Sequence, residues 1–195
     1  AMLVSRNYGA VAARGWFKDP SQSGGQILER ASHHIDLQRA IGGEVTAARV
    51  VGSSVPLAQA GDPSPAIEDA LALTLEFATG AVGTIDVAWT PTGHPAVHAL
   101  DVMAAQASIV LKLGPGSFDL GGVAGGVALT GSYGDPMRRS VRRFLDLARG
   151  ERDAAPFCTP RDALGTLAVA VACERALAGG DRVTVSGGPS AESLS

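Results

Sequence analysis

The sequence has little of several features that usually indicate a function at once. Only two cysteines, Cys158 and Cys173, occur in 195 residues, and no CxxC or Cys/His spacing surrounds them. So few cysteines argue against a disulfide framework and favour a reducing compartment. The longest uninterrupted apolar run, residues 167–173, is far shorter than the roughly 18 residues that a membrane span requires. We therefore expect a cytoplasmic protein that neither enters nor contacts a membrane.

The chain also lacks an excess of positive charge. Sixteen Lys and Arg residues stand against nineteen Asp and Glu residues, which gives a formal net charge of −3. Proteins that bind nucleic acid usually carry a strong basic field. The composition therefore predicts no nucleic-acid partner.

Phosphate-binding glycine motifs are absent as well. The sequence contains 25 glycines, yet neither G-x-G-x-x-G nor G-x-x-x-x-G-K-[ST] occurs. These motifs bring backbone N–H groups close to a pyrophosphate at the start of a helix. The chain itself is therefore not expected to cradle a dinucleotide.

What the chain does contain is the pattern of one α+β domain. A helix is expected over residues 26–41, begun by a Ser23/Gln26 capping box and ended by glycine. Two further helices are expected over residues 136–149 and 161–178, and β-periodic runs fill most of the intervening chain. The predicted strands are residues 45–53, 70–78, 81–90, 98–104, 108–113, 127–130 and 182–186. This order predicts a two-layer sandwich, with helices on one face of an open, mostly antiparallel sheet.

The domain boundaries follow from these elements. Residues 1–22 are expected to be a lead-in segment, residues 23–186 the domain, and residues 187–195 a flexible tail. The sheet face without helices carries small and mildly polar side chains, so it is predicted to pack on a second copy of the chain. In the helix over residues 136–149 the apolar side chains are expected to point inward, namely Met137, Val141, Phe144, Leu145 and Ala148.

The first helix carries the densest group of reactive side chains. At about 100° per residue, Glu29, His33 and Asp36 share one edge, whereas His34 lies about 100° further round. A carboxylate one turn from an imidazole can orient it and raise its pKa, which suits a base near neutral pH. Spacing alone leaves two alternatives open. Glu29 and His33 could form an ordinary surface pair, or Glu29, His33 and Asp36 could bind a metal, although no second segment supplies ligands.

Three other features allow two interpretations each. The cluster formed by Arg138, Arg139, Arg142 and Arg143 fits a solvated helix face better than a phosphate site. His94 and His98 flank a proline and are expected to remain away from the first helix. Trp16 either walls a substrate pocket or packs at the start of the first helix.

The stretch over residues 16–42 resembles the start of the C-terminal domain of Gfo/Idh/MocA oxidoreductases. The shared pattern is a Trp, a Gly pair, an acidic residue, a His four residues later, an Asp three residues after it and a closing Gly. In this sequence these are Trp16, Gly24, Gly25, Glu29, His33, Asp36 and Gly42.

The resemblance implies a set of roles. His33 would be the catalytic histidine that takes a proton from a substrate hydroxyl, with Glu29 in the acidic position beside it. Trp16, His34 and Asp36 would contact a sugar, polyol or related hydroxy substrate. NAD or NADP would be bound mainly by a Rossmann domain that this chain does not contain, so the chain alone is expected to be inactive. A non-catalytic binding or dimerisation module of the same fold is the alternative.

Overall fold

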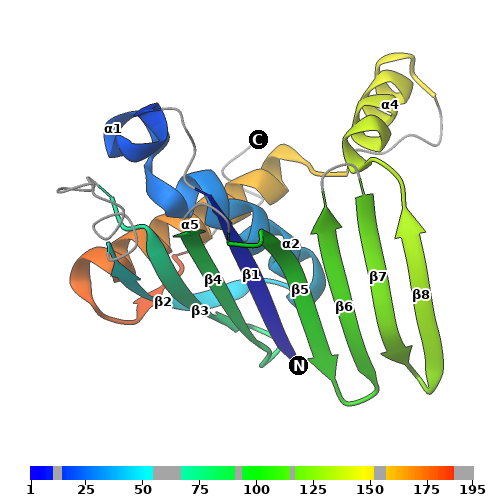
Figure 1. The fold of residues 1–195 in the computed structure, drawn as a ribbon, viewed down its shortest axis with the longest axis horizontal. Coiled ribbons are helices and arrows are strands. Elements are labelled where there is room, and N and C mark those ends of the chain that lie inside the picture. The colour runs from blue at the N-terminus through cyan, green and yellow to red at the C-terminus, as the bar shows by residue number, and fades with distance from the viewer. Residues whose placement is uncertain (11–14, 55–66, 91–93, 115–116, 152–156, 187–195) are drawn as a thin grey trace.

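A computed structural model of the chain describes residues 1–10, 15–54, 67–90, 94–114, 117–151 and 157–186. They form a single nine-stranded sheet in the order β8-β7-β6-β5-β1-β4-β3-β2-β9 (Figure 1). Every pair of neighbouring strands is antiparallel except β1 and β4, which run parallel. The strands are β1 (Met2–Ala10), β2 (Val45–Ser53), β3 (Ala70–Phe77), β4 (Val82–Thr90), β5 (Val97–Ala104), β6 (Ala107–Gly114), β7 (Ser117–Ala124), β8 (Val127–Tyr133) and β9 (Val183–Thr184).

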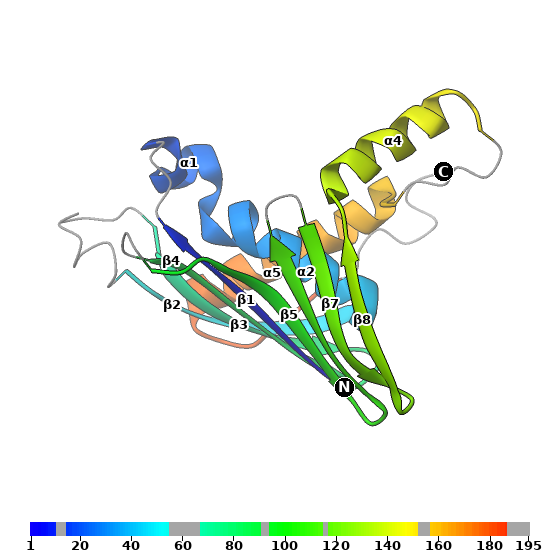
Figure 2. The same ribbon diagram turned by 45° about the vertical axis from the view of Figure 1, so that its right-hand side comes forward.

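The helices lie on one side of the sheet, and the other side is uncovered (Figure 2). The predicted α+β architecture, an open and mostly antiparallel sheet with helices on one face, is therefore confirmed. The helical segments are η1 (Gly15–Lys18), α1 (Pro20–Ser23), the π turn η2 (Ile27–Ala31), α2 (Ser32–Gly42), α4 (Pro136–Ala148) and α5 (Pro160–Gly179).

The core lies between the sheet and the helices α2 and α5. Alternation along β3 and β4 sends every second side chain toward the helices and the others to the uncovered face. Ile35 from α2 and Cys173 from α5 are fully buried against these strands. Gln38 of α2 is also buried, and its Nε2 donates to Ser5 Oγ at 2.9 Å and to the carbonyl oxygen of Thr84 at 2.8 Å. Helix α2 is thus fixed to the sheet by polar as well as apolar contacts.

Strand β1 was not expected from the sequence, because residues 1–22 were assigned to a lead-in segment. The structure instead places Met2–Ala10 in the middle of the sheet, between β4 and β5. The positions that face the helices include Ser5 and Asn7, whose side chains accept hydrogen bonds from helix residues. The inward face is therefore partly polar, and the apolar alternation on which strand prediction depends is missing.

Strand β7 was missed for a different reason. Its adjacent glycines, Gly121 and Gly122, suggest a loop rather than a strand. A Cβ at Gly122 would collide with the backbone carbonyl oxygen of Ser108 on β6. The strand therefore needs glycine at this position in order to pair closely with β6.

The start of the first helix differs from the prediction. Ser23 is not an N-cap: it ends α1, whose own N-cap is Asp19, with the Asp19 side chain accepting from the N–H of Ser21 at 2.9 Å. Gly24 and Gly25 then adopt positive φ angles of 75° and 80° before the chain enters η2. The capping box was therefore wrong. Asp19 followed by proline is the same N-cap signal that correctly predicted the helix beginning after Asp135.

Helix α4 also departs from the expectation. Its bounds agree with the prediction, but none of its residues is buried. The exposed fraction of the residue is 70% at Met137, 67% at Phe144, 52% at Val141 and 43% at Leu145. Figure 2 shows the reason, because α4 extends outward beyond the ends of β7 and β8 instead of lying over the sheet. The inward orientation predicted for this apolar face, Ala148 included, was wrong.

No helix in the described part of the chain is long and apolar enough to cross a membrane. The tail predicted for residues 187–195 lies outside the described residues.

Candidate functional site

The π turn η2 and helix α2 carry the side chains that the sequence singled out. In η2 the N–H of Ser32 donates to the carbonyl oxygen of Ile27, five residues earlier, so this turn holds one residue more than an α-helical turn. The extra residue shifts the phase between residues before and after it. The shared edge deduced from ideal α-helical spacing therefore does not extend across the turn.

His33 and His34 have opposite environments. His33 is exposed at the start of α2, whereas His34 is 1% exposed and packs toward the sheet. Only one of the two adjacent imidazoles can therefore reach a molecule in solution. Exposure thus distinguishes His33 from His34, and the choice of His33 as the working imidazole remains a prediction.

The ring of His34 packs on the ring of His98 from β5, with 4.8 Å between the ring centroids. Neither ring nitrogen of His34 has a hydrogen-bond partner. Burial, together with the nearby charges of His98, His33 and Arg30, lowers the pKa of His34 from 6.5 to about 4. His34 is consequently neutral at physiological pH and enclosed by protein.

His98 is the residue near this site that sequence reasoning placed elsewhere. It lies on β5 directly opposite Asn7 of β1, on the strand positions that face the helices. Part of its surface remains exposed, and desolvation lowers its pKa, with smaller contributions from the charges of His33 and Arg30. Alternation along β5 could have indicated that His98 faces the helices. Which residues of β5 face them follows from its pairing with β1, however, and β1 was not predicted.

The carboxylates of the predicted group are not brought together with His33. Glu29 is half-buried and makes no hydrogen bond or ion pair with His33 in the described part of the structure. Asp36 is exposed and accepts a hydrogen bond of 2.7 Å from Thr166 Oγ1 on α5. The simple surface ion pair between Glu29 and His33 is thus not formed, and Asp36 takes part in the contact between α2 and α5.

The metal alternative finds no support in the geometry. Among the described residues, no three His, Cys, Asp or Glu side chains are grouped so that they could hold an ion. The candidate ligands Glu29, His33 and Asp36 all belong to that described part.

Trp16 lies in η1, at one end of the sheet. It is 37% exposed, and its ring stacks on Phe17 with 3.9 Å between the centroids. Phe17 in turn packs against the small cluster of Ile67 and Trp89. Trp16 is thus held through Phe17 while presenting one side of its indole to solvent.

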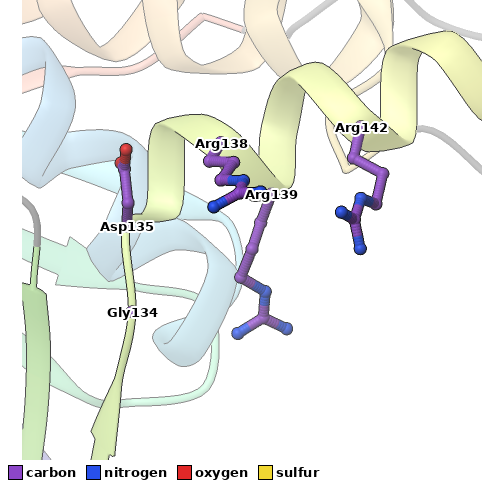
Figure 3. A pocket seen from close by; sticks show the side chains of 5 residues that line it. All are labelled: Gly134, Asp135, Arg138, Arg139 and Arg142. Carbon is purple, nitrogen blue, oxygen red and sulfur yellow. The ribbon is translucent and has the colours of Figure 1, made fainter.

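The arginine cluster lies away from these residues, on α4. A surface hollow of about 290 Å³ is lined by Gly134, Asp135, Arg138, Arg139 and Arg142, and Figure 3 shows the three arginines along the first turns of α4. All three are exposed, and none of their guanidinium groups makes a hydrogen bond or ion pair with another described residue. The Asp135 carboxylate caps α4 through the N–H of Met137 at 2.9 Å. This surface fits a solvated helix face.

Comparison with protein families provides the decisive observation. A model of the GFO/IDH/MocA C-terminal domain matches residues 2–110, which is more than half of the chain. The chain belongs to this family. No curated protein matches the sequence.

Solved structures of Gfo/Idh/MocA oxidoreductases share the fold. The WlbA dehydrogenase from Bordetella pertussis, in complex with NADH and UDP-GlcNAcA, is 19% identical and covers 95% of this chain, with a TM-score of 0.71. The aldose-aldose oxidoreductase from Caulobacter crescentus, complexed with glycerol, is 16% identical over 94% of the chain, with a TM-score of 0.76. Levoglucosan dehydrogenase, complexed with NADH and levoglucosan, is 16% identical over 94%, with a TM-score of 0.70.

The chain spans only about half the length of these relatives. The matched regions make up 54% of WlbA, 55% of the aldose-aldose oxidoreductase and 58% of levoglucosan dehydrogenase. Of the Gfo/Idh/MocA architecture, this chain therefore represents the C-terminal domain.

Proposed function

We propose that this chain is the substrate-binding domain of an NAD(P)-dependent oxidoreductase that acts on a sugar, a polyol or a related hydroxy compound. In this proposal His33 is the catalytic base, and Glu29 occupies the acidic position four residues before it. Trp16 and Asp36 bind substrate, whereas His34, which the resemblance also placed among the substrate contacts, is enclosed and is not assigned that role. The family membership of the chain and the sugar-related ligands named for its structural relatives support the substrate class.

The observation that carries the proposal is the contrast between His33 and His34. Oxidation of a hydroxyl to a carbonyl requires a base within hydrogen-bond reach of the departing proton. An exposed imidazole can accept that proton and release it to solvent. His33 is exposed and occupies the histidine position of the family motif, whereas His34 is enclosed.

The nicotinamide cofactor would be held elsewhere. NAD or NADP supplies the hydride acceptor when bound, but this chain carries neither of the glycine fingerprints that cradle phosphates. NADH is named in the complexes of WlbA and levoglucosan dehydrogenase, which supports a nicotinamide nucleotide as the cofactor. The residues of this chain would bind and orient the hydroxy compound and accept its proton.

The uncovered sheet face is the proposed surface for self-association, and the cytoplasm is the proposed location. That face carries small residues, including Ala72 and Thr84, around an ion pair between Arg6 and Asp101. A flat face of this composition can pack on its own copy about a two-fold axis. A homo-oligomer of the full enzyme would therefore leave the helix-covered side free for substrate.

The test joins this chain to a nicotinamide-nucleotide-binding domain and screens sugars and polyols, including levoglucosan, for formation of NADH or NADPH. Activity that is lost in His33→Ala supports the proposal. In parallel, the same compounds are titrated into the isolated chain while the imidazole signals are followed by NMR. Binding that shifts His33 without any turnover in the joined protein would favour the alternative, a non-catalytic binding module.

A further inference from the structure

Arg30 makes more polar contacts with the sheet than any other side chain of the π turn η2. Its Nη2 donates to Asn7 Oδ1 at 2.6 Å and to the carbonyl oxygen of Asn7 at 3.2 Å. Its Nη1 donates to the carbonyl oxygen of Ala88 at 3.2 Å and to Gln26 Oε1 at 3.3 Å. One guanidinium thus bridges η2 to both strands of the parallel pair β1 and β4 at the centre of the sheet.

All of these acceptors are uncharged. Arg30 forms no ion pair with another described residue, and its desolvation lowers its pKa from the usual value. Placing a cation in a partly buried site without a carboxylate is costly unless its hydrogen bonds are satisfied. A neutral side chain would avoid this cost, so the position requires the forked geometry of a guanidinium, which spans two strands at once.

The π turn itself is the second unusual feature. Such turns are rare, and each inserts one extra residue into the helical hydrogen-bond ladder. If η2 relaxed to an α-helical turn, the residues before and after it would rotate relative to one another by about 100°, the angle of one helical residue. Arg30 lies inside this turn, one residue after Glu29 and three residues before His33 in the sequence.

We propose that Arg30 is a positioning residue. By binding β1 and β4 from within η2, it stabilises the π turn and thereby fixes the direction in which the side chain of His33 projects from α2. The importance of Arg30 for catalysis rests on the proposed role of His33, whereas its stabilisation of the π turn does not. Its charge is close enough to contribute to the lowered pKa values of His34 and His98, which places Arg30 beside the imidazole cluster.

The structural claim can be tested on this chain by NMR. The N–H of Ser32 closes the π turn, so its hydrogen exchange reports opening of the turn, and its amide chemical shift reports a change to an α-helical turn, in which this N–H would bond Leu28 instead. In Arg30→Met we expect this exchange to accelerate roughly tenfold or more, because bonds from a charged donor are lost, and the imidazole signals of His33 to move. Arg30→Lys should behave in the same way, because a single ammonium cannot replace the fork.

Arg39→Met is the matched control. Arg39 lies on α2 and is equally well bonded, to Glu44, to Thr166 Oγ1 and to the carbonyl oxygen of Asp162. Loss of the Arg39 contacts should lower the free energy of unfolding of the whole chain. The ratio of the Ser32 exchange rate to the exchange rates of the other α2 amides should not change, and neither should the imidazole signals of His33. Equal effects in Arg30→Met and Arg39→Met would overturn the proposal, because Arg30 would then be a general stabiliser.

Two further measurements keep the outcome decisive. If Arg30→Met does not fold, Asn7→Ala removes the shortest of the Arg30 bonds from the strand side, and it should accelerate Ser32 exchange by a smaller factor; no change would contradict the proposal.

In the joined two-domain enzyme, Arg30→Met should lower kcat while leaving KM nearly unchanged. An unmodified enzyme without dehydrogenase activity would refute the proposed function, whereas the exchange data would still decide the role of Arg30.

Discussion

The imidazole rings of His34 and His98 lie 4.8 Å apart, one on helix α2 and the other on strand β5. This contact joins the helix that carries His33 to the half of the sheet beyond β1. It also buries a titratable ring whose two nitrogens have no hydrogen-bond partner. Stability and pH are therefore coupled at the base of the candidate site.

The first prediction concerns that coupling. His34 has a pKa of about 4 when folded and about 6.5 when unfolded, so between these values the unfolded chain binds more protons. The stability is complete above about pH 6.5, falls as the pH drops toward 4, and changes no further through His34 below that. The loss should amount to roughly 3 kcal/mol, measured by urea unfolding at a series of pH values.

His34→Leu should flatten this dependence and leave stability at pH 7.5 unchanged or raised, because two unpaired ring nitrogens are removed. His94→Leu is the control, since His94 is exposed and, among the described residues, its ring bonds only the carbonyl oxygen of Pro95. If both variants keep the unmodified pH profile, the titration of His34 is not the cause.

The second prediction ranks the two histidines in the joined two-domain enzyme. His33→Ala should lower kcat by roughly 100-fold or more, the usual contribution of a general base. His34→Leu should leave most of the turnover, because the ring is enclosed and cannot touch substrate. Steady-state kinetics at saturating cofactor measure both, and the opposite ranking would refute the assignment of His33.

The third prediction addresses self-association. The isolated chain should be at least dimeric at tens of micromolar by light scattering, and Ala72→Arg on the uncovered face of β3 should weaken the dimer by roughly tenfold or more through like-charge contact. Ala163→Arg places the same change on an exposed position of α5 and should have no effect. A monomeric unmodified chain would contradict this surface assignment.

The fourth prediction separates two isoleucines of one helix. Ile35 is fully buried, whereas Ile41 is 46% exposed. Ile35→Ala should lower the free energy of unfolding by roughly 2–5 kcal/mol, whereas Ile41→Ala should change it by about 0.5 kcal/mol or less. Chemical denaturation of the two variants provides the comparison, and similar losses would contradict the burial of Ile35 beneath α2.

Regular periodicity was sufficient to predict most of the fold. The strand over residues 45–53 has the predicted bounds, and the helix ending before Gly43 stops where the sequence indicates. Both elements have apolar side chains at the expected intervals and clear end signals. Local pattern and tertiary packing agree in these elements, so their bounds could be predicted from the sequence alone.

The failures occur where polar side chains occupy interior positions. Strand β1 hides its period because Ser5 and Asn7 face the helices and bind Gln38 and Arg30. The π turn could not be foreseen either, because ideal spacing assumes an uninterrupted α-helix. Both errors affected the site, since they determine where His33, His34 and His98 lie relative to one another.

Strand β1 has one more consequence. Consecutive strands β4 and β5 do not pair with each other, because β1 separates them. A chain without residues 1–10 would therefore leave the backbone edges of β4 and β5 unpaired, and each edge could pair with a strand of another protein. A synthetic peptide of residues 1–10 should pair with both edges and restore the fold by strand addition. The domain is thus suited to split-fragment complementation, with the first ten residues as the detachable piece.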